Sequence, residues 1–312
     1  MDELKKRISS SGAFRSFLKE RDASVIFRNY GWKAQHGVYY QDVDSGKHRE
    51  IDVLASQIWT KKTKSGTQYA RLRVPVEVKT MKEFHIIVSP TTGEEWGSRY
   101  RNNICLADSG NEYVRLRKDL QASGLPEGTV DSLIAGMHEF AWPKDRARLH
   151  SLMLVPPKEL VFTSFRETNI GGEKELENSV FWRASQNLNS AVKSIAESIY
   201  QYHIGWILAG RENEKFKGND YIDETFDWMC SQVQFVDIIH PVVVTDARLW
   251  SIEKNAPTEI GWARFGLHGY NDWPEWWCDL VNSSHLESYV ELLSNHYTSA
   301  LKKTKAKINS KQ

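Results

Sequence analysis

Two stretches of alternating apolar and polar residues stand out in the first third of the chain. Residues 51–55 and 72–78 place apolar side chains at every second position, a period typical of β-strands with one buried face. The polar interval 60–68, which contains Lys-Ser-Gly, predicts the turn that joins them. The pattern therefore predicts a β-hairpin.

The same alternation predicts where the charged side chains of this hairpin point. On the first strand, Asp52 takes the face opposite to that of Ile51 and Val53. On the second strand, Glu77 and Lys79 share one face. If the strands pair, these charged groups converge at one end of a sheet whose other face is apolar.

Two carboxylates and a lysine flanked by Val and Ile are costly to bury unless something compensates their charge. A hard divalent cation between Asp52 and Glu77 would do so, because Mg²⁺ in proteins is typically held by one or two carboxylates together with water and phosphate oxygens. The alternative is an exposed hairpin whose charges are solvated. The strands with Asp52 and with Glu77-Val78-Lys79 are therefore a candidate metal site.

This hairpin resembles the core of the PD-(D/E)xK nuclease superfamily, which carries an Asp on one strand and Glu-x-Lys on the next. The segments Glu-Ile-Asp-Val and Val-Glu-Val-Lys most resemble those of the branch that contains Holliday-junction resolvases and Mrr-type restriction nucleases. No Pro precedes Asp52, which departs from the pattern. The resemblance implies an α/β fold, a restriction-endonuclease-like core in which helices flank a central mixed β-sheet, with a large insertion.

The resemblance also implies roles for particular residues. Asp52, Glu77 and Lys79 match the catalytic positions, and Mg²⁺ or Mn²⁺ would bind Asp52, Glu77 and the backbone carbonyl of Val78. Lys79 would position the attacking water or stabilise charge on the phosphoryl oxygens.

Three further polar residues are candidates by their positions. Glu20, on the helix before the first strand, matches a Glu that completes the metal site in the family. Glu50 is a candidate for a further metal ligand or for a group that contacts a metal ligand. Gln186 follows Trp182 in the family's W-x-x-x-Q helix pattern and could face the cation or the water. The alternatives are a solvated residue for Glu20 and a polar helix flank for Gln186.

The remaining elements follow from periodicity and from stop signals. Residues 2–29 predict a helix that breaks near 9–12 and ends before Gly31. Pro241 and the three valines after it predict a strand covered on both faces. The other expected elements are a strand at 32–41, a helix at 173–200, an edge strand at 260–267 and a final helix at 285–301.

These elements and the resemblance together predict a discontinuous organisation. The nuclease core is expected at 1–80 and 176–268, with an insertion or subdomain at 81–175 whose basic and aromatic residues suit nucleic acid. A C-terminal aromatic segment and helix, 269–301, and a basic, disordered tail, 302–312, complete the chain. The tryptophans in 270–277 fit either a buried aromatic cluster or a platform for stacking bases.

The composition narrows the class of protein but does not indicate a function. The 312 residues carry a formal net charge of +1, which neither identifies nor excludes a nucleic-acid binder. The three cysteines are widely spaced and form no disulfide or zinc pattern. The charged start does not resemble a secretory signal, and no apolar run reaches membrane-spanning length. A reduced, cytoplasmic protein is expected.

The sequence therefore favours a metal-dependent nuclease that hydrolyses phosphodiester bonds, with DNA preferred over RNA and a possible role in restriction or anti-phage defence. Self-association as a homodimer, or with a partner subunit, is compatible with this reading. The alternative is a catalytically inactive nucleic-acid-binding or protein-interaction module on the same fold.

Overall fold

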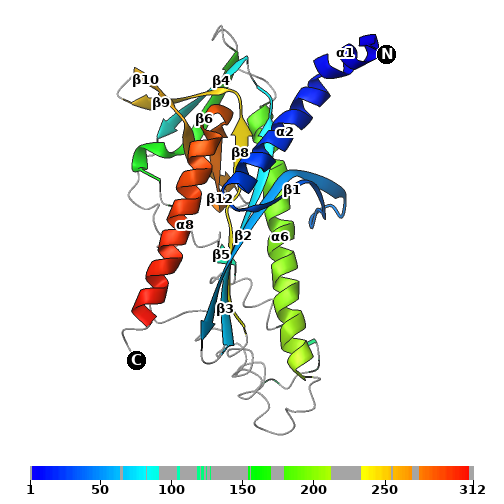
Figure 1. The fold of residues 1–312 in the computed structure, drawn as a ribbon, viewed down its shortest axis with the longest axis vertical. Coiled ribbons are helices and arrows are strands. Elements are labelled where there is room, and N and C mark those ends of the chain that lie inside the picture. The colour runs from blue at the N-terminus through cyan, green and yellow to red at the C-terminus, as the bar shows by residue number, and fades with distance from the viewer. Residues whose placement is uncertain are drawn as a thin grey trace.

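The fold was obtained as a computed structural model. It describes residues 2–63, 66–81, 83–90, 104–105, 154, 156–169, 179–211, 233–253, 256–268 and 274–308, with a few isolated residues between 118 and 127. In this part of the chain one large mixed β-sheet is combined with long helices (Figure 1). The protein is therefore a mixed α/β protein.

The bounds of four α-helices and two short 3-10 helices are given by the structure. The α-helices are α1 (Asp2–Ser10), α2 (Gly12–Asn29), α6 (Val180–Arg211) and α8 (Leu286–Ile308), and the 3-10 helices are η2 (Lys158–Leu160) and η3 (Ser283–His285). The strands of the first half are β1 (Lys33–Gln41), β2 (His48–Thr63), β3 (Gly66–Lys79), β4 (Phe84–Pro90), β5 (Ile104–Cys105) and β6 (Val161–Asn169). Those of the second half are β7 (Val233–Ile239), β8 (Val242–Thr245), β9 (Arg248–Glu253), β10 (Ala256–Ile260), β11 (Trp262–His268) and β12 (Pro274–Asn282).

The sheet is continuous across the whole described chain. Its main path runs β1-β2-β3-β8-β12-β11-β6-β4-β9-β10, while β7 pairs with β3 and β5. β1, β2 and β3 are antiparallel neighbours, and β8 runs parallel beside β3. β4 and β6, which come from the segment 81–175, are hydrogen-bonded members of this same sheet.

Helices cover both faces of the sheet and enclose two apolar cores. One core contains Phe27 of α2, Val290 of α8 and Val76 of β3, and the other contains Leu188 of α6 and Val243 of β8. All four residues of β8 are buried, as the run of valines predicted. In Figure 1, α8 and α6 flank the strands on opposite sides.

Several sequence predictions are confirmed in this first part of the chain. The predicted break in the first helix separates α1 from α2, and the side chain of Ser11 caps α2 by accepting a hydrogen bond from the backbone of Phe14. Gly31 follows α2 with φ +80, a conformation that glycine adopts without a steric penalty. The hairpin also forms, but its strands extend to Thr63 and from Gly66, so most of the interval 60–68 is strand rather than turn.

The long helix α6 begins later than predicted. It starts at Val180, and its N-terminus is capped by the buried carboxylate of Glu167 on β6, which accepts backbone hydrogen bonds from Val180 at 3.0 Å and Phe181 at 2.8 Å. The predicted start of the helix, at 173, lies outside the described residues. The helix continues to Arg211, beyond the predicted end at 200.

The C-terminal third departs most from the predictions. β11, expected as an edge strand, lies inside the sheet between β12 and β6. Trp276 and Trp277 are buried in β12, which fits an aromatic cluster in the core and excludes these two side chains from stacking on bases. The tail expected to be disordered continues as α8 to Ile308, because its lysines and alanine are good helix formers and Lys is favourable near a helix C-terminus.

Among the described residues, no helix has the length and apolar character needed to cross a membrane.

Candidate metal site at the fork between β2 and β3

The candidate site lies where two paired strands separate. The antiparallel ladder of β2 and β3 ends with the pair Val53↔Val76. Beyond this pair β3 continues beside β8, with Glu77 opposite Val243 and Lys79 opposite Thr245. A fork therefore opens in the sheet directly after the last pair, and the charged residues of the hairpin lie in it.

Along β2, the apolar side chains switch from one face of the sheet to the other at this fork. Ile51 packs in the core beneath α6, whereas Val53 packs in the core beneath α2 and α8. The prediction that Ile51 and Val53 share a face, opposite to Asp52, is therefore wrong. The change coincides with an irregularity in the neighbouring strand, where Gly37, between the partners of Val53 and Ile51, has φ +67 and departs from the regular extended conformation.

The three residues of the motif meet in this fork. The Nζ atom of Lys79 lies 2.6 Å from Oε2 of Glu77 and 3.3 Å from Oδ2 of Asp52. Oδ2 of Asp52 also accepts a hydrogen bond of 2.7 Å from the backbone N–H of Val78. The lysine ammonium thus bridges two carboxylates that belong to different strands.

Burial dominates the electrostatics of the site. The side chain of Glu77 is 2% exposed. Burial, together with the negative charge of Asp52, raises the pKa of Glu77 to about 7 despite the opposing effect of Lys79. Burial alone would lower the pKa of Lys79, but the carboxylates of Glu77 and Asp52 outweigh it and raise the pKa above its ordinary value. Lys79 is therefore charged at neutral pH, whereas Glu77 titrates there.

This raised pKa predicts a pH-dependent stability effect of Glu77→Gln in metal-free protein. Between about pH 4.5 and 7 the native state binds the Glu77 proton more tightly than the unfolded chain, so the free energy of unfolding falls as pH rises through this window. The neutral glutamine avoids that loss. We expect the variant to gain roughly 2–3 kcal/mol at pH 8 and nothing at pH 4.

Denaturant titrations of both proteins at the two pH values, with EDTA present, measure this difference. A variant that is less stable than the wild type at pH 8 would show that Glu77 is not a destabilised carboxylate.

Helix α2 brings a third carboxylate towards the fork. Oε2 of Glu20 lies 2.9 Å from Nε2 of His36 on β1, and its other oxygen accepts a 3.1 Å hydrogen bond from Ser16. The rings of Phe17 and His36 form an edge-to-face pair, with centroids 4.7 Å apart. The charge of Glu20 contributes to the raised pKa of Glu77. Glu20 is thus part of the electrostatic surroundings of the site.

The residue before Glu20 ties the same helix to the end of β8. Lys19 forms an ion pair with Asp246, and the carboxylate of Asp246 also accepts a hydrogen bond from the backbone N–H of Met81, just after β3. The side chain of Asp246 is 12% exposed. Asp246, which the sequence reasoning did not single out as a site residue, therefore anchors α2 to the ends of β3 and β8.

Two of the candidate residues lie apart from this cluster. Glu50 is exposed, and its carboxylate lies over Gly37. Gln186 is exposed on α6, whereas its neighbour Asn187 accepts a hydrogen bond from Tyr40 through its backbone carbonyl. The structure describes no contact that joins Glu50 or Gln186 to Asp52, Glu77 or Lys79.

The carboxylate oxygens in the fork suit a hard cation, but they do not complete its coordination shell by themselves. Asp52 and Glu77 present carboxylate oxygens to a common position, which is the chemistry that Mg²⁺ and Mn²⁺ prefer. In the part of the chain that the structure describes, no three or more His, Cys, Asp or Glu side chains are gathered closely enough to hold a metal ion. Water and phosphate oxygens would have to supply the remaining ligands.

A second polar cluster, fully buried, escaped the sequence analysis. Asp279 on β12 accepts hydrogen bonds from Arg264 at 2.6 and 2.8 Å and from the hydroxyl of Tyr289 at 2.6 Å. His240 lies 2.7 Å from the same carboxylate and 3.0 Å from the hydroxyl of Tyr297. Despite burial, Arg264 and His240 hold the pKa of Asp279 well below its ordinary value. This cluster joins β11 and β12 to α8.

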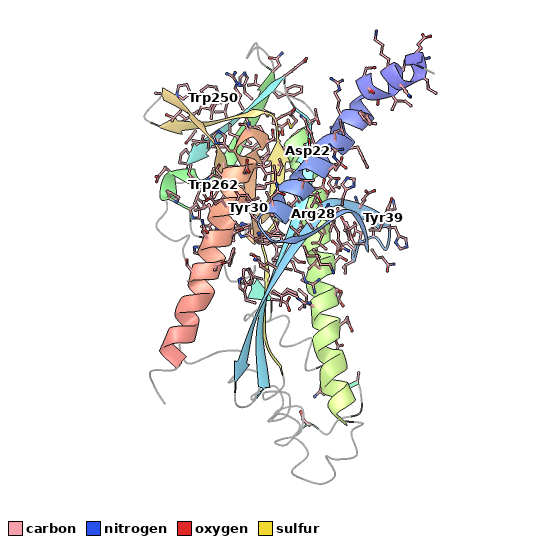
Figure 2. All side chains as sticks on the ribbon, in the orientation of Figure 1. Asp22, Arg28, Tyr30, Tyr39, Trp250 and Trp262 are labelled. Carbon is pink, nitrogen blue, oxygen red and sulfur yellow. The ribbon has the colours of Figure 1, made fainter. Side chains whose placement is uncertain are left out.

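The sequence did contain a signal for this cluster. Asp279 interrupts the apolar run of β12, and an unpaired charge in a strand buried on both faces would be strongly unfavourable. Figure 2 shows Trp262 beside α8, where its ring lies 5.4 Å from that of Tyr289 and closes the cluster from this side. The five side chains of the cluster are buried, and their hydrogen bonds tie the two strands to the helix.

Comparisons of the chain with protein-family models, with curated proteins and with solved structures find no match.

Proposed function

We propose that the protein is a metal-dependent nuclease of the PD-(D/E)xK type, which hydrolyses phosphodiester bonds with Mg²⁺ or Mn²⁺. The observation that carries the proposal is the convergence of Asp52, Glu77 and Lys79 in the fork between β2 and β3, with the lysine ammonium 3.3 and 2.6 Å from the two carboxylates. An acidic pair with a lysine beside it suits the binding of a divalent cation and of an anionic phosphodiester.

The order of elements around the fork supports the same proposal. α2 precedes the antiparallel strands β1, β2 and β3, and the long helix α6 and the buried strand β8, parallel to β3, come later in the chain, after β4, β5 and β6. This order resembles that of the superfamily core with an insertion. The resemblance concerns architecture, and the chemical proposal depends on the residues in the fork.

The residues of the fork have distinct roles in this mechanism. Asp52 and Glu77 would hold the metal, which would supply Lewis-acid chemistry for the attacking water and the scissile phosphate. The ammonium of Lys79 stabilises negative charge on the phosphoryl oxygens or orients the attacking water. The backbone N–H of Val78 fixes the carboxylate of Asp52 through its 2.7 Å hydrogen bond. Glu20 adds negative charge from α2.

DNA is the preferred substrate and RNA the second, by analogy with the superfamily branch that the motifs resemble. Association into a homodimer or with a partner subunit, and a role in restriction or anti-phage defence, are part of the same proposal. The alternative is an inactive nucleic-acid-binding or protein-interaction module on the same fold.

A substrate panel tests the proposal. Purified protein is incubated with linear, circular and branched DNA and with RNA, in Mg²⁺, in Mn²⁺ and in EDTA, and the products are separated on gels. We expect cutting that requires the divalent cation and is stronger on DNA. Cutting that persists in EDTA contradicts a metal-dependent mechanism, and binding without any cutting favours the inactive module.

A further inference from the structure

The ammonium of Lys79 occupies the position between the two candidate metal ligands. Its Nζ atom lies 2.6 Å from Oε2 of Glu77 and 3.3 Å from Oδ2 of Asp52. Both ion pairs that the structure describes for these two carboxylates are made with Lys79. The group is a compact unit charge, and it contacts the oxygens that a divalent cation would use.

The negative charge of the fork requires a counter-ion. Asp52 and Glu77 approach the same ammonium from two strands, and Glu20 adds a third carboxylate from α2. Glu77 is 2% exposed, so solvent screens its charge poorly. The like charges of these carboxylates repel one another, and a cation between them offsets that repulsion.

A divalent cation and the ammonium cannot both lie between these oxygens. Two cations a few ångströms apart in a poorly solvated site repel each other strongly. The side chain of Lys79 is 25% exposed and has a flexible four-carbon stem, so its head can leave the carboxylates towards solvent. That movement would make the ammonium of Lys79 available to an incoming phosphate group.

We propose that Lys79 is a built-in counter-ion that holds Asp52 and Glu77 together in the metal-free protein and is exchanged for a divalent cation when the site is loaded. The inference rests on the proposed function, because it takes these two carboxylates as the metal ligands. It adds that the lysine competes with the metal before it assists the reaction.

The proposal is tested by calorimetric titration with Mn²⁺ at pH 8 in the absence of nucleic acid. Lys79→Met keeps an unbranched, flexible side chain and removes its charge, so we expect it to bind Mn²⁺ at least about tenfold more tightly than the wild type does. Lys193→Met removes another lysine that is paired with an aspartate, Asp44 on the surface, and should leave the affinity unchanged.

The outcomes separate this inference from the proposed function. Equal or weaker Mn²⁺ binding by Lys79→Met than by the wild type overturns the counter-ion role, even if the protein cleaves DNA. If wild type, Lys79→Met and the added control Lys79→Met/Asp52→Asn all bind Mn²⁺ equally, the metal does not bind in the fork and both proposals fail.

A second measurement uses the wild-type protein and does not depend on the folding of a variant. Lysines are acetylated briefly with acetic anhydride, with and without Mn²⁺, and modification of Lys79 is quantified by mass spectrometry with Lys193 as the internal reference. Release of the ammonium from the carboxylates should raise the modification of Lys79 several-fold when Mn²⁺ is added. Unchanged or reduced modification contradicts the exchange.

Discussion

Asp52→Asn is expected to abolish divalent-dependent cleavage, lowering the rate by roughly 10³-fold or more. The substitution keeps the size of the side chain and its ability to accept the hydrogen bond from the backbone of Val78, but it removes one of the two charges that would hold the cation. Glu77→Ala and Lys79→Ala should be equally inactive, because each removes one role from the same fork. Initial rates on the preferred substrate, at saturating Mn²⁺, measure these losses.

The matched control is Asp22→Asn on α2, an exposed carboxylate paired with its neighbour Arg21. Its activity should equal that of the wild type, and the far-ultraviolet circular dichroism of all the variants should be unchanged. Undiminished divalent-dependent cutting by Lys79→Ala would refute the assigned chemistry, since the mechanism gives that lysine a direct role in stabilising charge.

Asp279→Asn should lower the free energy of unfolding by about 3–5 kcal/mol, because it removes the buried negative charge that pairs with the guanidinium of Arg264. Both side chains are almost completely buried, at 1% and 0% exposed for Arg264 and Asp279. Water therefore cannot replace the lost interaction. Urea titrations monitored by tryptophan fluorescence and by circular dichroism, on variant and wild type, give the difference.

A double variant separates a lost charge pair from poor packing. Arg264→Met/Asp279→Leu leaves no unpaired charge among these groups and should recover a substantial part of the stability that Asp279→Asn loses. Asp22→Asn again provides the surface control and should change stability by less than about 0.5 kcal/mol. A loss below 1 kcal/mol for Asp279→Asn would mean that the buried cluster contributes little.

The sequence was informative where one local rule determined the structure. Alternation identified β2 and β3, the valines after Pro241 identified β8, and Ser11 and Gly31 marked the ends of α2. The proximity of Asp52, Glu77 and Lys79 followed from the pairing of two neighbouring strands. Such features depend on contacts between residues that are close in sequence, or on a single pairing.

The rest of the site depends on contacts that no local pattern encodes. The change of faces at Asp52 coincides with a positive φ at Gly37 on another strand, and Asp246, which contacts Met81 after β3, follows a strand that is distant in sequence. Glu167 caps a helix from β6, a pairing that only the tertiary structure creates. Alternation alone therefore assigned Ile51 and Val53 to one face, although they belong to different cores.

Consecutive residues of α2 reach strands on either side of the fork. Lys19 is bound to Asp246 at the end of β8, while Glu20 is bound to His36 on β1, and β2 and β3 lie between these strands in the sheet. The helix therefore acts as a brace across the fork. Any motion that spreads β2 from β3 must stretch one of these two attachments or roll the helix, so α2 limits how far the two strands can separate.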